Sequence, residues 1–161
     1  MRSHITRLLA AIAVLVAPAT AAARGSVSHQ GTSEQQVLAL LNQVRASHGL
    51  SPLVASAPLR NAARAHSADM LQQGYFDHDS PGESWDSRIA RYLRSPLVGE
   101  NLALGRGSSG SAAGIVSQWM HSPPHRAIIL TAGLHRVGVG LAAGTFDGTP
   151  GAVLATADFA A

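Results

Sequence analysis

The residues best suited to chemistry in this chain of 161 residues are two histidines and one glutamate from three separate stretches. His78 lies within residues 76–81, Glu100 within residues 99–103, and His125 directly follows a Ser-Pro-Pro sequence. Proline restricts the backbone near His78 and His125, and Gly99 directly precedes Glu100. A restricted backbone can hold a side chain in one position. Imidazole and carboxylate groups that converge from distant segments act as metal ligands or as an acid–base pair.

Each of the three residues also has an ordinary structural interpretation. The aspartates beside His78 could simply solvate its loop, and Glu100 could cap nearby backbone amides in an otherwise apolar segment. His125 could belong to the first turn of a helix that begins at the two prolines. These alternatives stay open at the level of the sequence.

Other polar residues are weaker candidates. His66 falls on an apolar helical stripe, where we expect a core histidine satisfied by neighbours, with Asp69 as one partner. His121 lies close to a helix end, where the helix dipole favours a protonated ring. No Gly-x-Ser-x-Gly sequence exposes Ser80 or Ser122 as a nucleophile, so we do not expect a serine triad.

Helices account for much of the chain that must position these residues. Ser33 and Gln36 form a capping box, and the apolar spacing that follows predicts a helix that ends at Gly49. A second helix is predicted between Ser56 and Gly74, with Ser56 as its cap. Shorter helices are predicted after Ser84 and over residues 112–121, the latter with Ile115, Val116 and Trp119 on its apolar side.

Three stretches have the composition of strands. They are residues 97–104, 136–142 and 152–159, with residues 143–151 as a hairpin connection and residues 105–111 as a mobile Gly/Ser loop. Helices interspersed with a few strands favour helices packed on a small antiparallel sheet rather than parallel βαβ units. The sequence therefore predicts an α+β fold, a three-layer α-β-α sandwich with a small central antiparallel sheet.

The first residues have the order of a secretory signal peptide. Arg2 and Arg7 precede an apolar run over residues 8–16, and an Ala-x-Ala site ends at Ala23. We expect a signal peptide at 1–23, a flexible leader at 24–31 and one domain at 32–161. The alternative, a retained membrane anchor, has an apolar run shorter than the ~20 residues that a span needs. The predicted location is extracellular or in the cell envelope, that is, the periplasm or cell wall.

Composition excludes some classes of partner. The formal net charge is +3, and all twelve basic residues are arginines scattered without a stripe or interleaved aromatics. This is not the electrostatic footprint of a nucleic-acid-binding protein. The chain has no cysteine, so its core must hold together without disulfides. We expect a monomer without a stable membrane span.

Several motifs in one order resemble the bacterial branch of the CAP superfamily, also called the SCP domain, which includes cysteine-rich secretory, antigen 5 and pathogenesis-related proteins. The motifs are His-Ser-Ala-Asp-Met, Gly-Tyr-Phe-Asp-His, Gly-Glu-Asn-Leu-Ala, Trp-Met-His-Ser-Pro-Pro-His-Arg-Ala-Ile-Ile-Leu, Val-Gly-Val-Gly and a terminal Asp-Phe. The similarity extends from about Ser33 to Phe159.

This resemblance implies an α-β-α sandwich with a cleft lined by two histidines and two acidic residues. His78, Glu100 and His125 match three members of that tetrad, whereas the fourth position, a glutamate in the family, is Ser122 here. The sequence therefore predicts a cleft at His78, Glu100, Ser122 and His125. Its metal ligands are predicted to be His78, Glu100 and His125, with water in the place that Ser122 leaves open around a divalent ion such as zinc. The alternative is a metal-free cluster in which Glu100 orients one histidine by a hydrogen bond.

Two functions of different classes remain at this stage. The first is a secreted, non-enzymatic binding or interaction domain for a metal, a small molecule, a lipid or a cell-envelope or host component. The second is a peptidase-like hydrolase in which His78 or His125 activates water together with Glu100, directly or through zinc. A fold shared with a family does not decide between them.

Overall fold

The four strands of the described part of the chain form a single sheet. The computed structural model describes residues 21–161, with side chains described from Ser33 onward. The strands are β1 (Val54–Ala55), β2 (Val98–Arg106), β3 (Arg136–Phe146) and β4 (Thr149–Ala160), in the order β1-β3-β4-β2. β4 pairs antiparallel with both β2 and β3, whereas β1 pairs parallel with β3. The antiparallel prediction is therefore right for the three long strands and wrong for β1.

The short strand β1 was not predicted. It follows the extended segment around Pro52 and joins β3 through hydrogen bonds from Val54 N to His135 O and from Ser56 N to Val137 O, each 2.8 Å long. Two residues are too few for a recognisable alternating pattern, so only the fold reveals this pairing.

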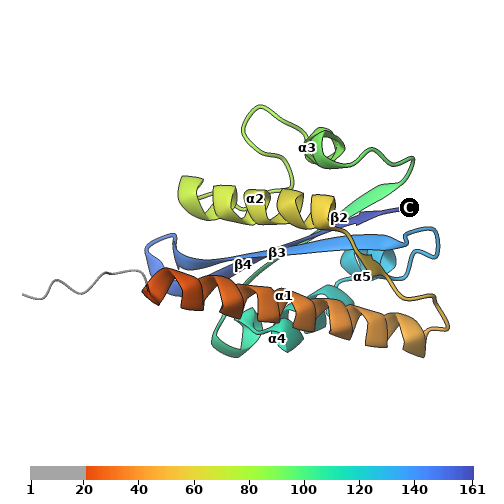
Figure 1. Cartoon of the computed structure of the whole chain (residues 1–161), viewed down its shortest axis with the longest axis horizontal. Helices are drawn as coiled ribbons and strands as arrows, with labels where there is room; N and C mark the ends of the chain where they lie inside the picture. The colour runs from red at the N-terminus through yellow and green to blue at the C-terminus, as the bar shows by residue number, and fades with distance from the viewer. Residues whose placement is uncertain (1–20) are drawn as a thin grey trace, which may run out of the picture.

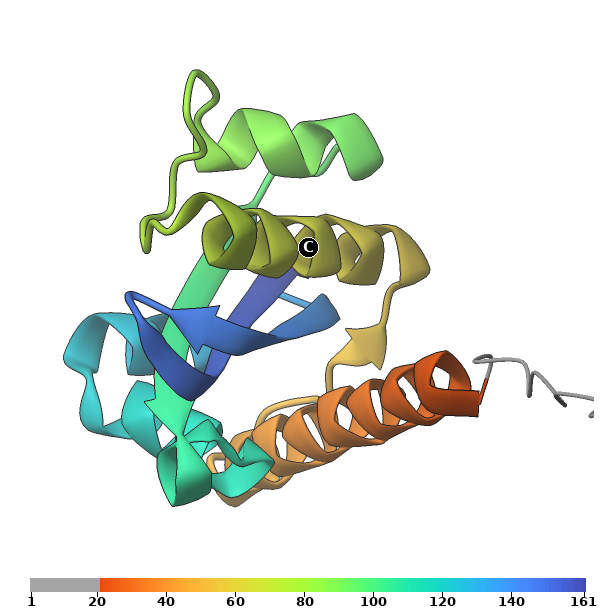
Figure 2. The same cartoon turned by 90° about the vertical axis from the view of Figure 1, so that its left-hand side faces the viewer.

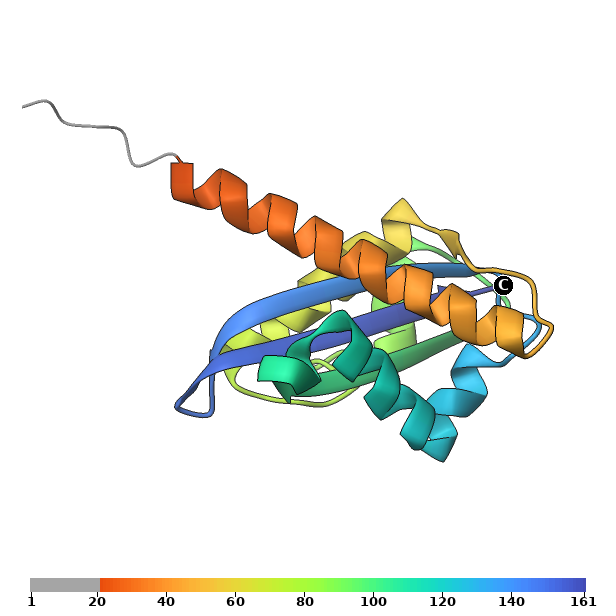
Figure 3. The same ribbon diagram turned by 90° about the horizontal axis from the view of Figure 1, so that it is seen from below.

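Helices cover both faces of the sheet, as the predicted three-layer sandwich requires. One face is covered by α2 (Ala57–Gln73), with α3 (Trp85–Tyr92) beside it, and the other by α1 (Ala21–Ser47) and α4 (Ala112–His121) (Figure 1). Viewed along the sheet, the strands lie between α2 and α1 (Figure 2). From below, α1 runs along the sheet with α4 and α5 (Pro123–Ile129) next to it (Figure 3).

The backbone of α2 packs close to β3, and two glycines of β3 allow this close packing. A Cβ atom on Gly138 would lie 1.9 Å from the backbone nitrogen of Arg60, and one on Gly140 would lie 2.1 Å from that of Arg64. No side chain fits in such a space. The Val-Gly-Val-Gly sequence of β3 thus places its valines on the face toward α1 and leaves the other face flat for α2.

The main core lies between the sheet and the layer of α1 and α4. The predicted inward residues of α4, Ile115, Val116 and Trp119, are all buried. The Trp119 indole also donates a hydrogen bond of 2.8 Å from Nε1 to the carbonyl oxygen of Leu102 in β2. This bond ties α4 to the sheet beside the predicted site.

Helix starts differ in part from their predictions. α1 begins at Ala21 rather than near Ser33, and since residues 21–32 contain no proline, helical hydrogen bonding can continue through the stretch predicted as a flexible leader. Ser56 and Ser84 occupy cap positions, but neither side chain makes a capping hydrogen bond.

The predicted signal peptide falls mostly on residues 1–20, outside the described residues. It stays a prediction, as do the boundaries of leader and domain.

Two predicted loops contain more regular structure than expected. Most of residues 105–111 form the end of β2 and a short 3-10 helix, η1 (Gly107–Gly110), where Ser109 Oγ accepts from Arg106 N at 2.9 Å. In the hairpin, β3 and β4 continue to a turn at Asp147 and Gly148, which both have positive φ as two-residue hairpin turns require. Within residues 21–161, no helix is long and apolar enough to cross a membrane.

Candidate functional site

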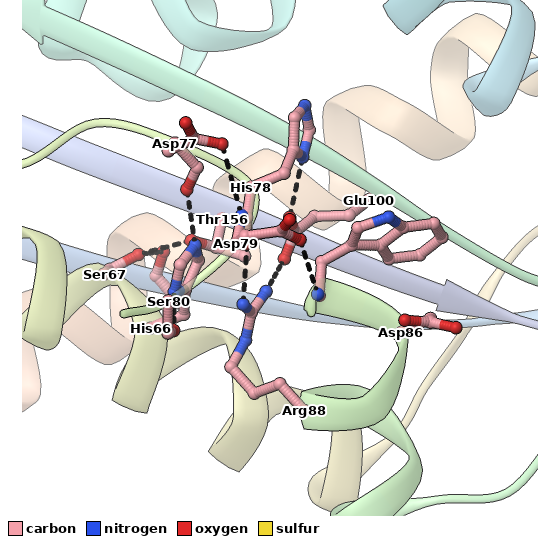
Figure 4. Close-up of polar contacts among 12 residues, drawn as sticks. His66, Ser67, Asp77, His78, Asp79, Ser80, Asp86, Arg88, Glu100 and Thr156 are labelled. Atoms are coloured by element: carbon pink, nitrogen blue, oxygen red, sulfur yellow. Dashed lines mark hydrogen bonds and ion pairs between the residues drawn. The ribbon is translucent and has the colours of Figure 1, made fainter. Parts of the chain in front are cut away.

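Glu100 is the centre of a buried polar cluster on the α2 side of the sheet. It lies near the start of β2, one of the two edge strands of the sheet, and only 3% of the residue is exposed. A carboxylate buried this deeply requires hydrogen-bond donors or a compensating charge. The structure supplies both, from α3 and from the loop between α2 and α3 (Figure 4).

His78 supplies the first donor. Its Nδ1 lies 2.7 Å from Glu100 Oε1, while 46% of its side chain remains exposed. Because an ionised carboxylate only accepts hydrogen bonds, the proton of the ring is on Nδ1. When the ring is neutral, its other nitrogen, Nε2, therefore carries a free lone pair. The structure thus brings His78 and Glu100 into direct contact.

Arg88 supplies the second donor, and sequence reasoning missed it. Its Nη2 donates to Glu100 Oε2, and its Nη1 donates to the backbone carbonyl of His78 at 2.8 Å. A signal was present, since Arg88 follows Trp85 by three residues and precedes Ile89 by one, which places it on the inward side of α3. The Arg88 guanidinium thus binds the Glu100 carboxylate and also the backbone of His78, whose ring that carboxylate orients.

These contacts shift the pKa values of both members of the pair. Desolvation alone would raise the pKa of Glu100, but the hydrogen bond from His78, the charge of Arg88 and a hydrogen bond with Asp158 lower it below its usual value. The hydrogen bond to Glu100 raises the pKa of His78, against a smaller opposing effect of desolvation. Glu100 is therefore an ionised acceptor at neutral pH.

His125 approaches the same edge of the sheet from the opposite layer. It lies in the first turn of α5, whose first two residues are the prolines, so the helix-start interpretation of this segment is correct. Asn101 of β2 holds the turn, since its Nδ2 donates to the carbonyl oxygen of His125 at 3.1 Å. Desolvation and the charge of His78 both lower the pKa of His125, so the two rings influence each other electrostatically.

A glycine lets α5 come close to β2. A Cβ atom on Gly99 would lie 3.0 Å from Ile128 Cγ2, so a side chain there would press on α5 beside Glu100. Ser122 ends α4 and precedes α5, is half-buried, and its side chain does not cap α5. The structure thus places Ser122 at the connection between α4 and α5, three residues before His125.

The three predicted metal ligands do not form one coordination sphere. Among residues 33–161, whose side chains the structure describes, no group of three His, Asp or Glu side chains is arranged to hold a metal ion. The physical reason lies in Glu100, both of whose carboxylate oxygens accept hydrogen bonds from His78 and Arg88. Glu100 instead lies behind the His78 ring and fixes its orientation. Carboxylates often hold metal-binding histidines in this way without touching the metal.

His66 is the core histidine that its apolar stripe predicted. It is fully buried on α2, and its Nε2 donates to the carbonyl oxygen of Asp77 at 3.0 Å. Asp69 is not its hydrogen-bond partner, because that carboxylate accepts from the Tyr75 hydroxyl at 2.5 Å. Burial and the charge of Arg88 lower the pKa of His66. His66 and Arg88 line a pocket of about 250 Å³ between α2 and α3.

The layers, the sheet order and the His–Glu pair at the edge strand define an α+β domain of the SCP type. Residues 38–158 match the model of the CAP family, described as the cysteine-rich secretory protein family, and the chain therefore belongs to this family. That match covers more than half of the chain and includes all the residues of the cluster described above.

Two bacterial proteins are similar to this chain in sequence. The chain is 35% identical to the uncharacterized protein YkwD of Bacillus subtilis over 77% of its length, and 36% identical to the uncharacterized membrane protein YlbC of the same organism over 70%. It covers only 49% and 32% of those two proteins, so both contain a long region without a counterpart here.

Solved structures support the fold. An extracellular SCP-domain protein from Bacillus anthracis is 27% identical, with a TM-score of 0.73, over 90% of this chain and 45% of that one. An outer surface protein of Borrelia burgdorferi has a TM-score of 0.68 over 80% of this chain and 91% of that protein. At 19% identity, the second likeness concerns the fold alone.

Proposed function

We propose that this chain is an exported, non-enzymatic binding domain whose ligand is held by the imidazoles of His78 and His125. The candidate ligands are a divalent cation such as zinc, or a small molecule or cell-envelope component that offers a group for imidazole to bind. With two protein ligands, the remaining positions around a metal would be filled by water or by the bound molecule, next to Ser122.

The observation that carries this proposal is the hydrogen bond between His78 Nδ1 and Glu100 Oε1. A carboxylate that accepts from one ring nitrogen fixes the orientation of the imidazole and makes the other nitrogen a better ligand. Glu100 is engaged a second time by Arg88, so it is poorly placed to take a proton from water. This double engagement favours a binding site over the alternative peptidase-like hydrolase.

Export is the second part of the proposal. It is supported by the predicted signal peptide and by the description of one structural neighbour, the Bacillus anthracis SCP-domain protein, as an extracellular protein. An intact mass of the secreted protein that begins at Arg24 would agree with it. A mass that includes residues before Ala21, or recovery in the membrane fraction only, would contradict it.

Calorimetric titration with zinc tests the binding site. We expect saturable heat from the wild-type protein at neutral pH and much less at mildly acidic pH, because imidazole must be deprotonated to bind a metal. The His78→Ala, His125→Ala double variant should show no saturable heat. A matched control is His121→Ala, which removes an exposed histidine at the end of α4. Equal heats for the wild type and the double variant would refute a metal site.

A broad peptide library tests the hydrolase alternative with the same proteins. We expect no cleavage by the wild type, with or without zinc. Cleavage that is lost in His125→Ala but kept in His121→Ala would overturn the non-enzymatic proposal and establish a peptidase.

A further inference from the structure

Asp158 is a buried acid that no part of the binding proposal uses. It lies in β4 directly opposite Glu100 in β2, and on its other side it faces Gly138 in β3. It has no exposed surface, and no N–H or hydroxyl donor of the described residues reaches either of its oxygens. The register of β2 and β4 places the carboxyl group of Glu100 beside it, so two buried acids lie next to each other.

A hydrogen bond between two carboxyl groups requires a proton between them. Ionised carboxylates only accept, and two of them side by side away from water repel each other strongly. One of the two groups is therefore protonated. Glu100 receives further donors from His78 and Arg88, which stabilise its ionised form, whereas Asp158 receives none. The proton consequently resides on Asp158.

The charges around the pair agree with this assignment. Arg88 from α3 already forms an ion pair with Glu100, and α2 contributes His66, which is buried beside the pair. The half-exposed His78 comes from the loop. A second carboxylate at Asp158 would have no cation of its own. Burial, followed by the charge of Glu100, raises the pKa of Asp158 well above its usual value.

We infer that Asp158 is a positioning residue that carries a proton and donates it to Glu100, as the third of three donors that hold this carboxylate in place. Glu100, held from three sides, keeps the proton of His78 on Nδ1 and directs the lone pair of Nε2 outward. Asp158 would thus act on the ligand site through two intervening hydrogen bonds without touching the ligand. The functional part of this inference depends on the binding role proposed for His78.

Two substitutions separate this role from simple packing. In Asp158→Asn, the amide N–H can donate to Glu100 in place of the carboxyl O–H, whereas Asp158→Ala leaves no donor. Thr156→Val is the matched control, because Thr156 lies on the same side of β4 and its buried hydroxyl bonds to Ser67 at 2.8 Å. Thr156→Val removes a buried hydrogen bond between α2 and β4 and leaves the hydrogen bonds of Glu100 unchanged.

Infrared spectra at neutral pH, and imidazole nitrogen NMR above the native pKa of His78, where its ring is neutral, give the readout. We expect a band of a protonated carboxyl group in the wild type that is missing in Asp158→Asn. The His78 nitrogen shifts should stay the same in Asp158→Asn and in Thr156→Val, and move toward a mixture of tautomers in Asp158→Ala. A wild type without the band, or His78 shifts that are unchanged in Asp158→Ala, would overturn the inference.

Zinc titration of the same variants distinguishes the two proposals. If the wild type binds no zinc, the binding role of His78 fails, while the infrared and NMR results still decide the protonation of Asp158. If the wild type binds zinc, we expect at least about tenfold weaker binding by Asp158→Ala and unchanged binding by Asp158→Asn. Equal affinities of the wild type and Asp158→Ala would refute the positioning role.

Discussion

Arg88 and Glu100 form an ion pair that is almost completely buried, with 3% and 1% of the two side chains exposed. The pair links α3 to the edge strand β2 and, through the Arg88 bond to the His78 carbonyl, fixes the loop between α2 and α3. Removal of one partner leaves an uncompensated charge in the interior, which typically costs about 3 to 5 kcal/mol.

Arg88→Met should therefore lower the free energy of unfolding by about 3 kcal/mol or more in denaturant titrations. The control is Arg91→Met on the same helix. Arg91 pairs with Glu83 at 2.8 Å, but its side chain is 62% exposed, and exposed pairs contribute about 1 kcal/mol or less. Equal losses of unfolding free energy in the two variants would show that the buried ion pair stabilises the fold no more than the exposed one.

Trp119→Ala should damage stability far more than changes at the site. The indole is fully buried between α4 and the sheet and donates to Leu102, and truncation of such an aromatic costs about 3 to 5 kcal/mol. His125→Ala, at the partly exposed start of α5, should cost less than about 1 kcal/mol. Thermal unfolding of both variants measures the difference, and equal melting temperatures would contradict the assignment of Trp119 to the core.

Gly138→Ala should prevent the close packing of α2 on β3. The new Cβ would meet the backbone of Leu59 and Arg60, which cannot move without displacing the whole helix. Gly144→Ala on the same strand is a fair control, because its Cβ would meet only the end of the Leu71 side chain, at 3.0 Å. In denaturant titrations, we expect a loss of several kcal/mol, or no folding, for the first variant and a small change for the second. Similar stabilities of the two variants would contradict the close approach of α2.

The raised pKa of His78 predicts how its contribution to stability depends on pH. The folded state binds the His78 proton more tightly than the unfolded state, for which the pKa is near 6.5. The resulting stabilisation is fully present below about pH 6.5 and is lost as the pH rises through the higher native pKa. The stability difference between the wild type and His78→Gln should therefore shrink from about pH 5.5 to about pH 8.5. A constant difference would refute the shift.

Local patterns predicted most of the fold. The spacing of Ile115, Val116 and Trp119 identified α4 with its correct bounds, and Gly74 ends α2 in the left-handed conformation that glycine adopts easily. These signals arise from neighbours within one or two helical turns. β1 could not be found in this way, because it has only two residues and they pair with β3, which lies far away in the chain.

The site was predicted in part, for a similar reason. His78, Glu100 and His125 stood out because a proline or a glycine lies close to each of them, and the structure joins His78 to Glu100 by a hydrogen bond. The donors that occupy Glu100 decide whether it can bind a metal, and they include residues of α3 and β4. The helical spacing of Arg88 indicated that it faces inward, but only the packing reveals that Arg88 and Asp158 are both buried against Glu100.

The most direct test of this account is the imidazole nitrogen spectrum of the exported protein during a zinc titration at neutral pH. In the zinc-free protein, we expect neutral His78 to carry its proton on Nδ1. With zinc, Nε2 of His78 and one ring nitrogen of His125 should shift together and saturate, while Nδ1 of His78 keeps its proton. Loss of that proton, or the absence of a saturable shift at both histidines, would contradict a site in which Glu100 orients His78 for binding.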